Sequence, residues 1–143
     1  MRILITGAGQ GLGCHIATAA LSRGNEVLAA VHSLSHVSKE ISKLQERYGE
    51  RIMVFEMDVS DEQSVQKAVQ TLSSKEEALD GIVNNAAIMV EREKTIEELD
   101  LSAMQISFEV NTIGPMRVVQ QFLPMLYRGN EQVIVNISSE AGT

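Results

Sequence analysis

The stretch that decides the fold is Thr6-Gly7-Ala8-Gly9-Gln10-Gly11-Leu12-Gly13, which follows the apolar run Arg2–Thr6 and precedes a helical pattern. Glycine has no Cβ, so its backbone can turn sharply and approach a ligand closely. A helix N-terminus presents free N–H groups and the positive end of the helix dipole, which together suit a pyrophosphate. Although some glycine-rich stretches are only tight turns, this position between a first strand and a first helix favours dinucleotide binding.

Further apolar runs follow the first one along the chain. Each is short and mostly continuous rather than alternating, which is typical of strands covered on both faces. The expected strands are Arg2–Thr6, Glu26–Val31, Arg51–Met57, Gly81–Asn84 and Gln132–Ser138.

Helical patterns lie between these runs. One helix face is expected from the spacing of Val37, Ile41, Leu44 and Tyr48. Capping-box spacing predicts helix starts at Ser60 (with Gln63) and at Ser102 (with Gln105), the second pattern continuing to about Tyr127. Strands that alternate with helices predict βαβ units with right-handed crossovers. We therefore expect a doubly wound, Rossmann-like α/β fold with a parallel sheet of about five strands.

Length and charge narrow the classes of function. The chain has 143 residues, a formal net charge of −7 and 44% hydrophobic residues, which fits one soluble domain. The acidic balance argues against nucleic acid or an anionic membrane as a partner. No apolar run approaches the roughly 20 residues that span a bilayer, and the N-terminus does not resemble a signal peptide, so we expect a cytoplasmic protein.

A single cysteine, Cys14, excludes an internal disulfide framework, and no metal site is expected. Its place in the first turn of the helix after the glycines would stabilise a thiolate, but a small packing residue is the favoured interpretation.

The glycine spacing T-G-x-x-x-G-x-G, formed by Gly7, Gly11 and Gly13, resembles that of the short-chain dehydrogenase/reductase family. Four further motifs extend the resemblance in the same order along the chain. These are Asp58-Val59 after the third strand, Asn84-Asn85-Ala86-Ala87 after the fourth, Val110-Asn111-Thr112-Ile113-Gly114, and Val135-Asn136-Ile137-Ser138-Ser139 at the fifth.

The resemblance implies an NAD(P)-dependent oxidoreductase that acts on a carbonyl/alcohol pair. It places cofactor binding on Gly7, Gln10, Gly11, Leu12, Gly13, His32, Asp58, Val59, Asn85, Ala86 and Ala87, and catalytic roles on Ser139 and Asn111. Ser139 would bond the substrate oxygen, and Asn111 would anchor a water. Asp58 could instead only cap the following helix. Ala87 replaces the family's glycine and would be strained if its φ were positive.

The choice of nicotinamide cofactor depends on the end of the second strand. NAD-selective enzymes usually place a carboxylate there to bind the ribose 2′-OH. Here the residues are Val31, His32 and Ser33, so a 2′-phosphate would meet no repulsion and could accept hydrogen bonds. We favour NADP(H) over NAD(H) on this ground, although His32 could also be an exposed residue without a ligand role.

The family's Tyr-x-x-x-Lys pair is absent from these 143 residues. Only Tyr48 and Tyr127 occur, and the residues four positions later are Ile52 and Glu131. We therefore expect residues 1–143 to be a C-terminally incomplete dinucleotide-binding domain that binds cofactor and is inactive on its own. A non-catalytic dinucleotide-binding or interaction module derived from the family is the alternative; a nucleotide-sugar epimerase relative is disfavoured by the glycine spacing.

Three structural expectations follow. Pro115 lacks an N–H, which deprives the Asn111 carbonyl of its helical partner, so we predict a kink with that oxygen facing water or a ligand. The alternative is a kink that only wraps the helix around the sheet. The fifth strand should be an open edge. The apolar face of the 102–128 helix, which includes Phe108, Val119, Phe122 and Leu126, should lack a neighbour and favour a homo-oligomer.

Overall fold

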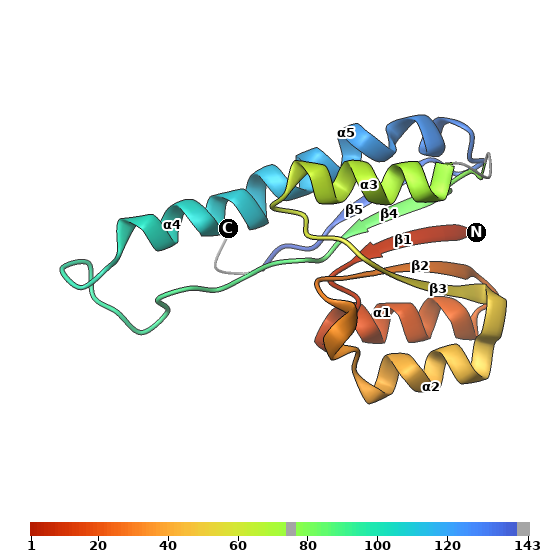
Figure 1. Cartoon of the computed structure of the whole chain (residues 1–143), viewed down its shortest axis with the longest axis horizontal. Coiled ribbons are helices and arrows are strands. Elements are labelled where there is room, and N and C mark those ends of the chain that lie inside the picture. Colours follow the sequence, from red (N-terminus) through yellow and green to blue (C-terminus); the bar gives the residue numbers. More distant parts are fainter. Residues whose placement is uncertain (74–76, 140–143) are drawn as a thin grey trace.

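Five parallel strands form one sheet at the centre of the molecule (Figure 1). The computed structural model describes residues 1–73 and 77–139. The strands are β1 (Arg2–Thr6), β2 (Glu26–Val31), β3 (Ile52–Glu56), β4 (Gly81–Asn84) and β5 (Val133–Asn136), arranged in the order β3-β2-β1-β4-β5. Since the order reverses between β1 and β4, the carboxyl ends of these two strands border the crevice where such folds bind ligands. The predicted doubly wound α/β fold is confirmed.

Helices cover both faces of the sheet (Figure 1). One face carries α1 (Gly11–Ser22) and α2 (Lys39–Tyr48), and the other carries α3 (Glu62–Ser73) and α5 (Gly114–Tyr127). A helix α4 (Leu101–Phe108) continues into α5 through a π-helical turn, η3 (Glu109–Ile113). Two short 3-10 turns, η1 (Leu34–His36) and η2 (Gly49–Arg51), flank α2.

The continuous apolar runs divide between two cores. Leu4 and Leu28 contribute to the core under α3 and α5, whereas their neighbours Ile5 and Ala29 contribute to the core under α1 and α2. Successive side chains of a strand point to opposite faces, so a strand buried on both faces must be apolar at every position. This is the physical reason for the absence of an alternating pattern.

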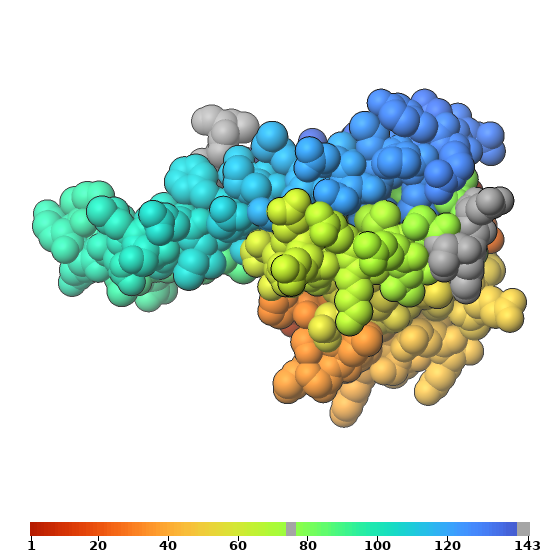
Figure 2. Space-filling model, turned by 45° about the horizontal axis from the view of Figure 1, so that its top comes forward, coloured from red at the N-terminus to blue at the C-terminus, as the bar shows by residue number. Residues whose placement is uncertain are grey.

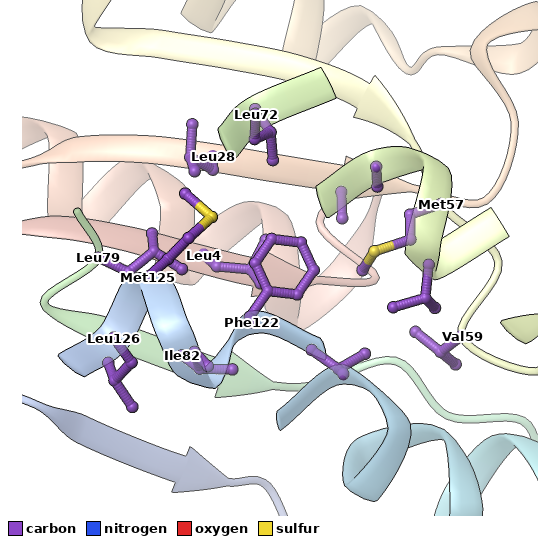
Figure 3. Close-up of a cluster of buried hydrophobic side chains, with 14 residues drawn as sticks. Leu4, Leu28, Met57, Val59, Leu72, Leu79, Ile82, Phe122, Met125 and Leu126 are labelled. Carbon is purple, nitrogen blue, oxygen red and sulfur yellow. The ribbon is translucent and has the colours of Figure 1, made fainter. Parts of the chain in front are cut away.

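The α3–α5 core corrects one expectation about the long helix. Phe122 and Leu126 are 0% and 3% exposed, and the Phe122 ring lies at the centre of this core (Figure 3). They do not belong to an uncovered face, because α5 packs on β4 and on α3. Phe108, by contrast, is 61% exposed, and Val119 is half-buried.

Both predicted capping boxes are wrong, although both helices exist. Asp61 caps α3 by accepting the Gln63 N–H at 3.0 Å. Asp100 caps α4 by accepting the Ser102 N–H at 2.9 Å. In each case an aspartate within two residues of the expected serine takes the cap, since the short carboxylate accepts from the free N–H groups at a helix start at least as well as a hydroxyl does.

The segment that carries α4 extends away from the body of the molecule (Figures 1 and 2). None of the α4 side chains is buried. Strand β5 lies at the edge of the sheet, as expected, and its residues are all exposed. Among the described residues, no helix is both long and apolar enough to cross a membrane.

Candidate functional site

A cleft of about 810 Å³ opens at the carboxyl ends of the strands. Loops that follow β1, β2, β3 and β4 line it, together with Ile106 of α4 and Val110 of η3. Of the residues predicted to bind a cofactor, those on the cleft wall are Gly7, Gln10, Gly11, His32, Asp58, Val59, Asn85, Ala86 and Ala87. The parallel sheet therefore brings together four segments that are far apart in the sequence.

The glycine stretch forms a tight turn against the start of α1. Gly7 and Gly11 have φ angles of +63° and +55°, which L-residues rarely adopt. A Cβ on Gly7 would also lie 2.8 Å from the Ala86 Cα, so the turn packs closely on the segment after β4. The Gln10 side chain makes no capping hydrogen bond, and the first turn of α1 holds no acidic residue. The N-terminus of α1 is thus left with N–H donors and a positive dipole end.

Two predicted residues of this stretch do not line the cleft. Gly13 is buried, and a Cβ there would collide with the Gly7 carbonyl oxygen and lie 2.5 Å from Asn85 Nδ2. Its place in the motif reflects the close packing of α1 on the turn rather than an open wall for a ligand. Leu12 is 54% exposed on the first turn of α1.

The segment after β4 is tied to the end of β1 by a residue that the sequence interpretation missed. Thr6 is 1% exposed, and its Oγ1 accepts the N–H groups of Asn85 and Ala86, both at 3.0 Å. The Asn85 amide donates in return to the carbonyl oxygens of Thr6 and Gly7, at 3.1 and 3.2 Å. Asn85 thus positions the glycine turn. The threonine in the T-G-x-x-x-G-x-G spacing was the available signal.

Asp58 lies on the cleft wall, and it does not cap α3, because Asp61 takes that position. Its Oδ1 accepts the Ser60 N–H at 2.9 Å and the Ser60 hydroxyl at 2.6 Å, which closes the turn before α3. Its Oδ2 lies 3.9 Å from Nδ1 of His32 across the cleft wall. The carboxylate is therefore shared between a local turn and the end of β2.

The end of β2 contributes more polar groups than predicted. His32 and Ser33 line the cleft, and so do His36 at the end of η1 and Ser38 at the start of α2. A chain of hydroxyl contacts links Ser33 to Ser35 at 2.6 Å and Ser35 to His36 Nδ1 at 3.2 Å. His36 and Ser38 were missed because only the η1 turn brings them back to the cleft. The polar run that begins at Ser33 was the available signal.

Asn111 lies in the π turn η3, directly before α5, which carries Pro115 at its start, so the helix is irregular at this place, and the predicted kink stays a prediction. The Gly114 N–H bonds the Glu109 carbonyl, five residues back. The side-chain amide of Asn111 bonds the main chain of Ile88, accepting its N–H and donating to its carbonyl oxygen, both at 2.8 Å. The direction of the Asn111 main-chain oxygen stays a prediction. π turns of this kind often occur at functional sites.

Three further expectations from the sequence concern Ser139, Ala87 and Cys14. Ser139 is exposed beyond the end of β5 and is not on the cleft wall. Ala87 is not among the described residues with positive φ, so the alanine carries no strain of the kind considered. Cys14 is 6% exposed, and burial, with the Glu40 carboxylate second, raises the pKa of its thiol, as expected for a packing residue.

Known proteins share this fold and these segments. The chain is 30% identical over 142 residues to the NADP-dependent 3-hydroxy acid dehydrogenase of Schizosaccharomyces pombe, covering 98% of this chain and 54% of that protein. It is 33% identical over 147 residues to the mitochondrial D-beta-hydroxybutyrate dehydrogenase of Mus musculus, covering 98% and 41%. The chain therefore spans about half the length of the curated relatives that it matches.

The solved structures agree with the sequence relatives. NADPH-bound carbonyl reductase from chicken fatty liver matches with a TM-score of 0.90 and 29% identity, over 99% of this chain and 60% of that one. The Pseudomonas aeruginosa RhlG/NADP active-site complex matches with a TM-score of 0.88 and 27% identity, over 99% and 55%. The family model described as short chain dehydrogenase matches residues 1–143. The chain therefore belongs to the short-chain dehydrogenase family, whose members are oxidoreductases that bind a nicotinamide dinucleotide.

Proposed function

We propose that residues 1–143 form the dinucleotide-binding part of an oxidoreductase that acts on a carbonyl/alcohol pair. The observation that carries this proposal is the convergence of the glycine turn, the Asp58-Val59 loop and the 85–87 segment on one cleft of about 810 Å³. The start of α1 would accept the pyrophosphate, because the Gln10 side chain does not cap it and its first N–H groups lack acceptors within the helix. The Asp58-Val59 loop would take the adenine end.

We further propose NADP(H) as the favoured cofactor. The wall after β2 offers His32, Ser33, His36 and Ser38, and no carboxylate follows that strand directly. The nearest acidic groups are already engaged: Glu56 accepts the Leu34 N–H at 3.1 Å, and Asp58 is shared with Ser60. Hydroxyl and imidazole donors suit a phosphate. The names of the NADP-dependent yeast relative and of the NADPH-bound reductase are consistent with this preference.

Calorimetry with 2′-phospho-ADP-ribose and ADP-ribose tests the preference directly. One or two charge-assisted hydrogen bonds are worth about 1.5–3 kcal/mol, so the phosphorylated ligand should bind about tenfold to a hundredfold more tightly. Replacing both His32 and His36 by asparagine should remove most of this difference and leave ADP-ribose affinity unchanged. Tighter binding of unphosphorylated ADP-ribose would refute the NADP(H) assignment while leaving dinucleotide binding intact.

The catalytic proposal concerns Ser139 and Asn111. When bound, the cofactor would supply or accept the hydride, while the Ser139 hydroxyl would bond the substrate oxygen and the π turn would hold the Asn111 main chain near it. These 143 residues contain no Tyr-x-x-x-Lys pair, so they hold no proton donor of that type. We therefore expect cofactor binding without useful turnover.

Absorbance at 340 nm with NADPH and a panel of aldehydes and ketones measures turnover. Clear oxidation of NADPH by the purified chain would contradict the assignment of proton transfer to the missing pair. A non-catalytic binding module derived from the family stays the second candidate, because the same missing pair favours it. The intact mass of the protein in its source separates the two: a mass near 15.6 kDa supports the module, and a larger one supports the enzyme.

A further inference from the structure

Arg117, near the start of α5, connects two segments of the cleft wall. Its Nη1 donates to the Val59 carbonyl oxygen at 2.7 Å, across a sequence separation of 58 residues. Its Nη2 lies 3.1 Å from Oε2 of Glu109, the first residue of the π turn. The Arg117 side chain is only 15% exposed. A planar guanidinium can hold a carbonyl and a carboxylate at once, which a single ammonium does poorly.

A second contact joins the same two segments. Val59 is 6% exposed and packs on Gly114, which directly follows the π turn. A Cβ on Gly114 would lie 2.9 Å from Val59 Cγ2, so nothing larger than glycine fits between them. Val110, inside the π turn, packs against the core that contains Val59. The loop after β3 and the π turn therefore meet through a side-chain contact as well as through Arg117.

Asn111, the middle residue of the π turn, holds the turn to another segment. Both polar groups of its side-chain amide bond the main chain of Ile88, at 2.8 Å each. The turn is thus attached on one side to the segment after β4 and on the other, through Arg117, to the loop after β3. A displacement of the Val59 loop would be transmitted to Asn111 through Arg117.

We propose that Arg117 is a positioning residue that couples occupancy of the adenine end of the cleft to the placement of Asn111. The inference rests on the proposed function, since it takes the Asp58-Val59 loop as the adenine contact. A ligand that orders this loop would, through the Val59 carbonyl and Glu109, also order the π turn. The coupling requires the bridge that Arg117 forms between the Val59 carbonyl oxygen and Glu109, and not only a positive charge on α5.

The test uses the complete chain, 5′-AMP as the probe and Arg117→Met as the variant. Arg128→Met is the matched control, because Arg128 follows α5, is exposed and, among the described residues, its side chain makes one contact, at 3.3 Å to the Glu77 carbonyl oxygen. Calorimetry measures the affinity for 5′-AMP. Amide NMR follows the side-chain NH₂ signals of Asn111 as 5′-AMP is added.

In the wild-type protein and in Arg128→Met, saturating 5′-AMP should shift the Asn111 NH₂ signals. In Arg117→Met, 5′-AMP should bind about tenfold more weakly, the scale of one charge-assisted hydrogen bond, and at saturation should leave these signals unshifted. Glu109→Ala provides a second variant that keeps the fold, since the Glu109 side chain is 51% exposed. Glu109→Ala removes the carboxylate that Arg117 contacts and should also abolish the shift of the Asn111 signals.

A purely structural role for Arg117 makes a different prediction. It would lower stability to urea but leave the Asn111 shift intact at saturation in both bridge variants, and that result would overturn the proposal. If the wild-type protein does not bind 5′-AMP at all, the proposed function fails and the coupling fails with it. If the wild-type protein binds 5′-AMP and the variants respond as it does, only the coupling fails.

Discussion

Gly13→Ala probes the packing that forms the glycine turn. The added Cβ would collide with the Gly7 carbonyl oxygen and lie 2.5 Å from Asn85 Nδ2. Overpacking of this kind costs about 1–3 kcal/mol. Displacing the Asn85 amide would also break its hydrogen bonds to Thr6 and Gly7, at about 1 kcal/mol each. The expected loss is therefore about 3–5 kcal/mol, a large part of the roughly 5–15 kcal/mol that stabilises a domain.

Urea unfolding followed by far-ultraviolet circular dichroism measures the free energy of unfolding. Two matched substitutions separate the causes. Gly9 has no positive φ, and a Cβ there would first meet Val31 Cγ1 at 3.4 Å, so Gly9→Ala should cost less than about 1 kcal/mol. Gly11 has open space around it but a φ of +55°, so Gly11→Ala should cost about 1–2 kcal/mol from backbone strain alone.

The test compares the losses in unfolding free energy of these three variants. If the unfolding free energies of Gly13→Ala and Gly9→Ala differ by less than about 1 kcal/mol, the error of such comparisons, close packing of α1 on the turn is not what requires a glycine at position 13. A Gly11→Ala cost above that of Gly13→Ala would show that backbone conformation outweighs the steric contact. Binding of ADP-ribose should weaken in Gly13→Ala, because the turn that holds Gly7 must move.

Other predictions address separate parts of the molecule. Thr6→Val keeps the side-chain shape but leaves two main-chain N–H groups without their acceptor, so the free energy of unfolding in urea should fall by about 2–3 kcal/mol. Thr18→Val, at an exposed site, is the control and should change the free energy of unfolding little. Hydrogen bonds from the main-chain N–H groups of Arg2 and Asn130 lower the pKa of Asp80. Its carboxylate therefore stabilises the fold above about pH 4 and loses this effect as pH falls through the lowered pKa. The difference in unfolding free energy between the wild type and Asp80→Asn, measured in urea, should become smaller over that pH range and not larger. Self-association through the 102–128 helix should appear as a concentration-dependent mass in light scattering that Phe108→Ser reduces, and a monomer at every concentration would contradict it.

The sequence by itself determined the elements and their order. Apolar runs without alternation, such as Val27–Val31, are typical of strands covered on both faces, and the glycine stretch predicted which end of the sheet would face a ligand. Pro115 predicted a kink near Asn111, because a missing N–H is a local covalent property, and the structure has a π turn there. Helix starts were less secure, since Asp61 and Asp100 competed with neighbouring serines for the same N–H groups.

Only the tertiary structure decided which residues hold the cleft together. Thr6 meets Asn85 across 79 residues, and Arg117 meets Val59 across 58 residues, so neither contact leaves a periodic trace in the chain. The closeness that makes Gly13 a packing residue depends in the same way on where β4 lies beside β1. Periodicity reports the few neighbours within one turn or strand. Hydrogen bonds and steric contacts between distant segments depend on strand order and register, which exist only once the sheet has formed.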